Sequence, residues 1–170
     1  MHKRIYLLGF MGSGKTTHGM TIARMMGYDF VDMDKWIEET TGMTVPEIFK
    51  THGEPWFRQQ EHRAITELSK RDRVVIATGG GAPCHGENME LMKQSGLTIY
   101  LKLSPEALLS RLKVSKNRRP LLEGKSEEEM RHTIKEMLHH REPFYSNADM
   151  IIDGLERVNE RVVNAIQRQQ

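Results

Sequence analysis

The sequence Gly9-Phe10-Met11-Gly12-Ser13-Gly14-Lys15-Thr16 is a glycine, four free positions and then Gly-Lys-Thr, the pattern of a loop that cradles phosphate groups. The apolar run 4–8 before it predicts a buried strand, and the proline-free run 17–26 after it predicts a helix. The glycines allow backbone N–H groups to approach phosphate oxygens at the positive end of the helix dipole. A glycine-rich turn with a chance lysine is the alternative, but strand, loop and helix in this order favour a nucleoside triphosphate site.

The side chains of this phosphate loop (residues 9–16) have separate expected roles. Lys15 is placed to reach the outer phosphates, and the Thr16 hydroxyl to ligate the Mg²⁺ that accompanies the nucleotide. The nucleotide-binding residues predicted from this part of the chain are Gly12, Ser13, Gly14, Lys15, Thr16 and Thr17.

Length and composition limit the classes of protein that the chain can represent. Its 170 residues suit a single domain, 1–170, and 25 Lys+Arg against 23 Asp+Glu give a formal charge of only +2, which does not argue for a nucleic-acid partner. The single cysteine, Cys84, excludes an internal disulfide and favours a reducing compartment. No segment approaches the roughly 20 apolar residues of a membrane span. We therefore expect a cytoplasmic protein without a membrane partner, and a monomer as the simpler state.

Predicted strands alternate with helices along the chain. Strands are expected at 4–8, 28–32, 73–78, 97–101 and 149–152, and helices at 17–26, 34–40, from 44, at 56–70, 87–94, from 104, at 126–141 and at 155–167. This order predicts an α/β fold, a three-layer sandwich with a five-stranded parallel sheet and right-handed crossovers. Ligands of such sheets bind beyond the carboxyl ends of the strands, where the remaining motifs fall.

Two carboxylates follow the second predicted strand. Asp32 and Asp34 are two residues apart, so both can project to the same side. A kinase needs one carboxylate near the metal and another that accepts a hydrogen bond from the attacking hydroxyl, and we assign these roles to Asp32 and Asp34 respectively. The alternative is that Asp34 caps the helix that follows it.

Two further motifs can line a substrate site. Arg58 and Glu61 lie one helical turn apart, so Glu61 can hold the guanidinium in one rotamer for an anionic substrate, although a surface ion pair explains the spacing equally well. The run Gly79-Gly80-Gly81 ends the third strand at a high cost in backbone entropy. Three successive glycines therefore favour a close approach by substrate over a plain turn.

Basic residues in the second half of the chain have two explanations each. The basic segment 113–119, followed by a hinge-like 120–124, predicts either a solvated loop or a mobile lid around 112–124 that brings an arginine onto the transferring phosphoryl group. Arg141 ends the long predicted helix and either binds an anion or complements the helix dipole.

Taken together, these motifs resemble those of shikimate kinases. They occur in that family's order and spacing and span nearly the whole chain: 9–17, Asp32-Met33-Asp34, Phe57-Arg58 with Glu61, Thr78-Gly79-Gly80-Gly81, Arg119-Pro120-Leu121-Leu122 and Arg141-Glu142-Pro143-Phe144-Tyr145. The resemblance implies a P-loop kinase fold of the nucleoside-monophosphate-kinase type. It also implies transfer of the γ-phosphoryl group of ATP to the 3-hydroxyl of shikimate, in the pathway to chorismate and the aromatic amino acids.

The resemblance further implies roles for single residues. On the acceptor side, Asp34 would contact the ring hydroxyls, Arg58 and Arg141 would grip the carboxylate, and the three glycines would help to fix the substrate. A helical segment around 33–62 would also bind the substrate. On the nucleotide side, Arg119 would be the lid arginine on ATP, and Arg157 would lie near the adenine. The catalytic residues implied are Lys15, Asp34 and Arg119; the substrate-binding residues are Asp34, Arg58, Gly79, Gly80, Gly81 and Arg141; the Mg²⁺ site is Thr16 with Asp32 as a water-mediated partner.

Two other classes of protein remain as alternatives. A related kinase that acts on gluconate or a nucleoside monophosphate keeps the phosphate loop, but it does not need Arg58 and Arg141 to meet on a carboxylate. A nucleotide-dependent regulatory module without turnover needs neither Asp34 nor the three glycines. The rate of ADP release with each acceptor separates these classes.

Overall fold

The computed structural model describes residues 2–115 and 122–168. They contain a five-stranded sheet in the order β2-β3-β1-β4-β5, in which every neighbouring pair is parallel. The strands are β1 (Arg4–Leu8), β2 (Asp29–Asp32), β3 (Val74–Ala77), β4 (Leu97–Lys102) and β5 (Met150–Asp153). The predicted α/β class with its five-stranded parallel sheet is confirmed, and each strand end lies within one residue of its expected position.

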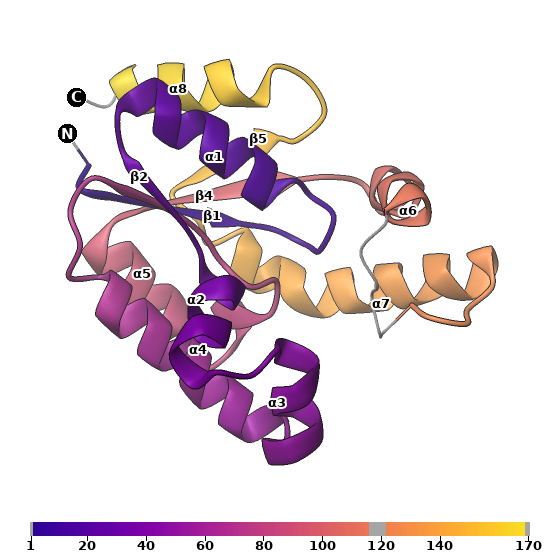
Figure 1. Cartoon of the computed structure of the whole chain (residues 1–170). Helices are drawn as coiled ribbons and strands as arrows, with labels where there is room; N and C mark the ends of the chain where they lie inside the picture. Colours follow the sequence, from indigo (N-terminus) through magenta and orange to yellow (C-terminus); the bar gives the residue numbers. More distant parts are fainter. Residues whose placement is uncertain (1, 116–121, 169–170) are drawn as a thin grey trace.

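Helices cover both faces of the sheet (Figure 1). One face carries α1 (Lys15–Met26) and α8 (Val158–Arg168). The opposite face carries α2 (Met33–Thr41), α3 (Val45–His52), α4 (Glu54–Leu68), α5 (Asn88–Ser95) and the end of α7 (Glu127–Tyr145). The helix α6 (Pro105–Val114) packs on α7, and a short 3₁₀ helix, η1 (Ala82–Cys84), follows β3. No helix in the described ranges combines the length and apolar character needed to cross a membrane.

Alternation along β1 builds the two cores. Ile5 and Leu7 are fully buried in the cluster beneath α1 and α8, whereas Tyr6 and Leu8 are fully buried against α2, α4 and α5. Successive side chains of a strand point to opposite faces, so a strand covered on both faces must be continuously apolar. This burial fixes the strand that leads into the phosphate loop.

Local capping determines where several helices begin. At α3, Thr44 Oγ1 accepts a hydrogen bond from the Glu47 N–H, and the Glu47 carboxylate accepts one from the Thr44 N–H at 2.7 Å. This capping box sets the start of the helix that was expected from residue 44. Ser104 likewise caps α6, with Pro105 in its first turn.

Several helix boundaries differ from the predicted ones by one to four residues. The helix α4 begins at Glu54 instead of residue 56, because Pro55 fits the first turn of a helix. The helix α7 continues through Pro143 to Tyr145, so the prediction that it ends near residue 141 is wrong. A proline removes a backbone hydrogen bond, but the completely buried Tyr145 anchors the last turn in the core. The helix α8 begins at Val158 instead of residue 155.

Candidate active site

The phosphate loop packs tightly against its surroundings. Gly9, Gly12 and Gly14 have φ values of 150°, 79° and 90°, which side chains rarely adopt. A Cβ on Gly12 would lie 2.9 Å from Leu112 Cδ2 of α6. No side chain caps the start of α1 at Gly14, so its first N–H groups face the loop in the manner of an anion site.

Lys15 lies across this loop. Its Nζ donates hydrogen bonds to the carbonyl oxygens of Gly9 at 2.7 Å and of Phe10 at 3.0 Å. The ammonium is therefore held over the backbone that the nucleotide phosphates are expected to contact.

Thr16 and Asp32 meet between α1 and β2. The Thr16 hydroxyl donates to Asp32 Oδ2 at 2.7 Å, while Asp32 Oδ1 accepts from the Lys35 N–H and caps α2. The alternative that Asp34 is the helix cap is therefore wrong, because Asp34 lies in the first turn. A hydroxyl and a carboxylate are hard oxygen donors of the kind that Mg²⁺ prefers, so this pair fits the expected metal. The described residues hold no cluster of three or more His, Cys, Asp or Glu side chains around a metal position, and Mg²⁺ commonly completes its shell with phosphates and water.

The glycine turn (Gly79-Gly80-Gly81) brings the predicted substrate residues together. A Cβ on its first glycine would lie 2.7 Å from Glu61 Oε2 and 3.0 Å from Asp34 Oδ1. A Cβ on the second would lie 3.1 Å from Arg141 Nη1, and one on the third 2.7 Å from Arg58 Nη1. Charged side chains from α2, α4 and α7 therefore surround one turn, at distances that only glycine allows.

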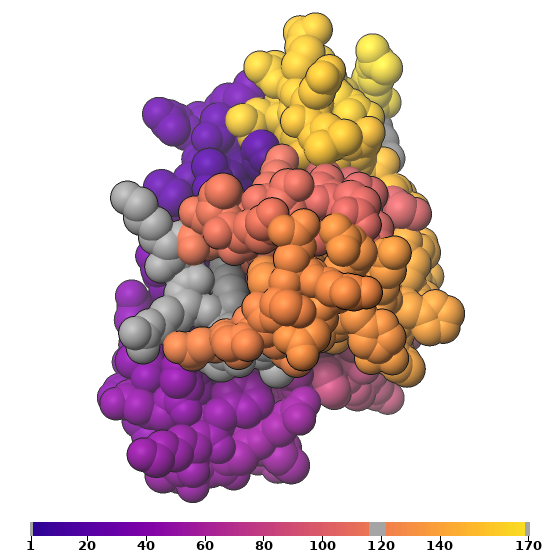
Figure 2. Space-filling model, turned by 90° about the vertical axis from the view of Figure 1, so that its right-hand side faces the viewer, coloured from indigo at the N-terminus to yellow at the C-terminus, as the bar shows by residue number. Residues whose placement is uncertain are grey.

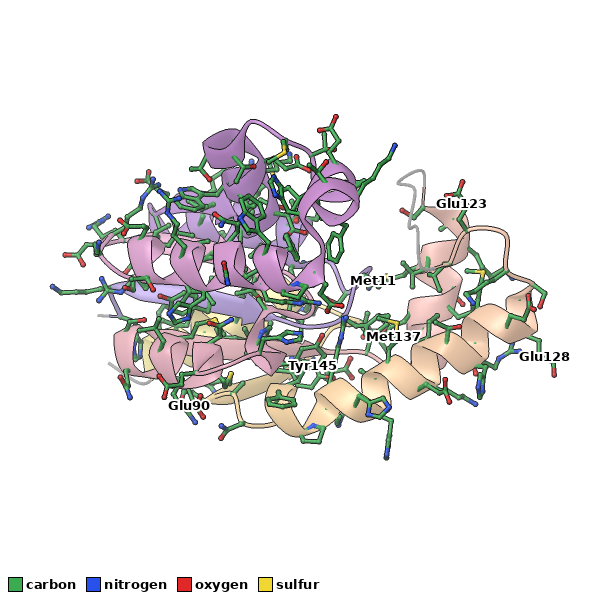
Figure 3. All side chains as sticks on the ribbon, turned by 90° about the horizontal axis from the view of Figure 1, so that it is seen from below. Met11, Glu90, Glu123, Glu128, Met137 and Tyr145 are labelled. Atoms are coloured by element: carbon green, nitrogen blue, oxygen red, sulfur yellow. The ribbon has the colours of Figure 1, made fainter. Side chains whose placement is uncertain are left out.

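The same turn also adjoins the phosphate loop. A Cβ on Gly80 would lie 3.6 Å from both the Gly9 carbonyl oxygen and the Met11 nitrogen. Met11 and Met137 both pack against the hydrophobic cluster that contains Tyr145 of α7, and all three residues are labelled in Figure 3. The predicted acceptor residues and the predicted nucleotide residues therefore share one region at the carboxyl ends of the strands.

Arg58 is bound by two carboxylates. Its Nη1 lies 2.6 Å from Glu61 Oε1 and its Nη2 lies 3.1 Å from Glu54 Oε1. The Glu61 side chain is only 1 % exposed, so the interpretation of this pair as a surface ion pair is wrong. Burial raises the pKa of Glu61 to about 7, and the positive charge of Arg58 offsets this only in part.

Arg141 approaches the turn from α7. Its Cζ lies 5.4 Å from the centroid of the Phe10 ring in the phosphate loop, within the range of a cation–π contact. The last turn of α7 contains no basic residue, so the alternative that Arg141 complements the helix dipole there is wrong. Tyr145, one turn further along α7, donates a hydrogen bond to the Gly80 carbonyl oxygen.

Sequence reasoning missed two residues of this region. Glu54 is four positions before Arg58, a spacing that signals contact on a helix, but the predicted helix began after it. Arg111 donates to the Ser13 carbonyl oxygen at 3.3 Å and to that of Gly154 at 3.0 Å, and so ties the phosphate loop to the segment after β5. No sequence signal pointed to Arg111, because all its partners are distant in the chain.

The lid and its neighbours are only partly described. Arg119 lies outside the described residues, so its predicted place on ATP stays a prediction. Lys113 belongs to α6, and its Nζ lies 2.6 Å from Glu127 Oε2 of α7. The prediction that Lys113 belongs to a loop is therefore wrong. Figure 2 shows α6 and α7 between α8 at the top and the segment of α3 and α4 at the bottom.

Two other residues named from the sequence are Arg157 and Cys84. Arg157 has a φ of 49° and lies between β5 and α8, where its carbonyl oxygen accepts from the Arg161 N–H. Cys84 is half-buried, and burial raises the pKa of its thiol to about 11, so it is protonated at neutral pH and a poor nucleophile.

Comparisons with known proteins extend over nearly the whole chain. The family model for shikimate kinase matches residues 11–170. The shikimate kinase of Parabacteroides distasonis is 44% identical over 164 residues, which cover 96% of this chain and 95% of that protein. The crystal structure of the shikimate kinase from Bacteroides thetaiotaomicron matches with a TM-score of 0.92 at 40% identity, over 99% of this chain and 98% of that one.

Two further solved structures also resemble this chain, one of a shikimate kinase with bound shikimate and one of a gluconokinase. The shikimate kinase from Acinetobacter baumannii, in complex with shikimate, matches with a TM-score of 0.86 at 37% identity and covers 98% of this chain and 92% of that one. A gluconokinase from Sinorhizobium meliloti has a TM-score of 0.60 at 17% identity, over 99% of this chain and 97% of that one, which shows a common fold alone. With a family model that matches residues 11–170, and matches of 40% identity and more over nearly the full length of both chains, this chain belongs to the shikimate kinase family.

Proposed function

We propose that the glycine turn, Asp34, Arg58 and Arg141 bind shikimate in this chain. As a member of the shikimate kinase family, the protein is an ATP-dependent phosphotransferase that acts on the 3-hydroxyl of shikimate, in the pathway to chorismate. The observation that carries the residue assignment is the convergence of these three charged side chains on one turn that also adjoins the phosphate loop. An acceptor bound there lies next to the nucleotide.

Charge explains how this site selects its acceptor. Arg58 and Arg141 present guanidinium groups to the third and second glycines of the turn, and guanidinium groups form forked hydrogen bonds with carboxylates. A substrate without a carboxylate cannot form these forked hydrogen bonds, which lowers its affinity. Glu54 and Glu61 hold the Arg58 side chain before substrate arrives.

Asp34 is the residue that we assign to the reacting hydroxyl. Its Oδ1 lies beside the first glycine of the turn, so an acceptor hydroxyl bound there can donate a hydrogen bond to it. Phosphoryl transfer depends mainly on alignment and charge neutralisation, so Asp34 orients the hydroxyl and takes its proton late.

The nucleotide side requires the phosphate loop and a metal. Lys15 would exchange its contacts with the Gly9 and Phe10 carbonyl oxygens for the outer phosphates of ATP. Thr16 and Asp32 would hold Mg²⁺, which when bound neutralises charge on the β- and γ-phosphates. Arg119 would act on the same phosphates from the lid.

The function is tested by measuring ADP release with shikimate, gluconate and nucleoside monophosphates as separate acceptors. Shikimate should support turnover and the others should not, and turnover should depend on added Mg²⁺. Preferential turnover of gluconate or a nucleoside monophosphate would contradict the proposed acceptor. ATP binding without turnover of any acceptor would favour a regulatory module.

We further propose that the protein acts as a cytoplasmic monomer without a nucleic-acid partner. In support of the absence of a nucleic-acid partner, the formal charge of +2 is close to balance. Size-exclusion chromatography with light scattering tests the monomer, and a dimer at the working concentration of the enzyme would contradict it.

A further inference from the structure

The glycine turn is held by hydrogen bonds from several elements. At its start, the Thr78 hydroxyl donates to the Leu7 carbonyl oxygen of β1 at 3.0 Å. In its middle, Tyr145 of α7 donates to the Gly80 carbonyl oxygen. Beyond its end, the Asn88 side-chain amide donates to the Ala82 carbonyl oxygen at 2.9 Å. The position of the turn is therefore fixed from both flanks.

Asn88 connects the turn to the helix that carries Arg58. Its side chain is 1 % exposed, and its Oδ1 pairs with His62 Nδ1 of α4 at 2.8 Å. Because the Asn88 amide nitrogen donates to Ala82, its oxygen is the acceptor and His62 Nδ1 the donor. A buried amide whose two ends are both bonded holds its two partners at a set separation.

Tyr145 connects the turn to the helix that carries Arg141. The residue is completely buried, and its ring packs on Tyr100 with the centroids 5.0 Å apart. Burial raises the pKa of the Tyr145 hydroxyl further above its usual value, so it remains a donor across the neutral pH range. Its bond to Gly80 lies one helical turn from Arg141.

We propose that Asn88 and Tyr145 are positioning residues for the acceptor substrate, which they affect by fixing the carbonyl groups of Ala82 and Gly80. The inference rests on the proposed function of the turn. A Cβ built on each glycine of the turn would lie 2.7 to 3.1 Å from a charged side chain; these side chains are Arg58, Arg141, Glu61 and Asp34. The turn therefore cannot shift toward them without moving a charged group. The Tyr145 bond comes from α7, the helix that supplies Arg141. The Asn88 bond comes from α5 and is linked through His62 to α4, the helix that supplies Arg58, so the turn and both guanidinium groups keep their spacing. Loss of either bond should weaken shikimate binding and leave ATP binding unchanged.

The test uses two near-isosteric substitutions. Tyr145→Phe removes only the hydroxyl, and Asn88→Asp keeps an oxygen for His62 but cannot donate to the Ala82 carbonyl oxygen. Each should raise the KM for shikimate, and its Kd by calorimetry, by about five- to tenfold, the factor for one hydrogen bond, while the Kd for ATP stays within about twofold. The matched control is Tyr6→Phe, which removes a buried hydroxyl bonded to Ser95 at 2.9 Å, at the opposite end of the sheet.

The control separates positioning from general stability. Tyr6→Phe should lower Tm without changing the KM for shikimate. The proposal is overturned if Tyr145→Phe and Asn88→Asp leave the KM for shikimate unchanged, or if they weaken ATP and shikimate binding equally, as a purely structural role would. Absence of turnover with shikimate in the unmodified enzyme would instead contradict the proposed function.

Discussion

Replacement of Glu61 by glutamine tests the buried carboxylate on which the Arg58 geometry depends. Glutamine has nearly the same shape and keeps an oxygen for Arg58 Nη1, which lies 2.6 Å from Glu61 Oε1. The substitution removes the titrating proton and the negative charge. Burial raises the pKa of Glu61 from 4.5 to about 7; Arg58 and Arg141 oppose this rise and Asp34 adds to it.

The sign of the effect on stability follows from proton binding. Between pH 4.5 and about 7 the folded protein retains the Glu61 proton while the unfolded chain has released it, so this group makes the free energy of unfolding decrease as pH rises. At about 1.4 kcal/mol per pH unit, the gap between 4.5 and about 7 corresponds to about 3.5 kcal/mol at most. The contribution of Glu61 to the free energy of unfolding is fully present below pH 4.5 and is lost above about pH 7. Glu61→Gln should therefore gain stability relative to the unmodified protein as pH rises through this window.

Urea unfolding followed by circular dichroism measures this difference. Both proteins are unfolded at several pH values from about 5 to 8, and the free energies of unfolding are subtracted so that all other titrating groups cancel. Glu54→Gln is the matched control, since Glu54 contacts the same guanidinium but its side chain is 56% exposed. A difference between Glu61→Gln and the unmodified protein that is constant with pH, or that changes in the opposite direction, would refute a buried carboxylate with a raised pKa.

Three substitutions test the proposed roles at the reacting groups. Asp34→Asn should lower kcat by ~10²–10⁴ with nucleotide affinity retained, measured by ADP release and calorimetry, and normal turnover would remove Asp34 from the mechanism. Arg58→Ala should raise the KM for shikimate far more than the KM for ATP, because the carboxylate loses a forked partner; equal losses would point to a folding defect. Arg119→Ala should lower kcat by about 10³ or more, and an unchanged kcat would contradict a lid arginine.

The fold could be predicted because its signals are local. Ile5 to Leu8 alternate between two covered faces, and the phosphate loop follows them directly, so strand, loop and helix were evident from spacing alone. The capping box of Thr44 and Glu47 involves residues three apart and was equally visible. Helix ends were predicted less accurately: the helix expected to end at residue 141 continues through Pro143, because burial of Tyr145 anchors its last turn.

The candidate site was predicted as a set of residues, without its contacts. The spacing of Arg58 and Glu61 indicated that they touch, but not that Glu61 is buried, and burial is what distinguishes a surface ion pair from a positioned guanidinium. The proximity of Asp32 and Asp34 did not reveal which of them caps α2, because both lie within reach of its first turn.

The sequence by itself determined the phosphate loop, the order of strands and helices, and the charged residues at the strand ends, because each depends on neighbours a few positions away. Only the tertiary structure decided which of these groups meet. Tyr145 bonds to Gly80 across 65 residues and Arg111 to Ser13 across 98. Such contacts depend on how the covered sheet brings α4, α6 and α7 to its carboxyl edge, and that packing is a property of the whole chain and not of any local pattern.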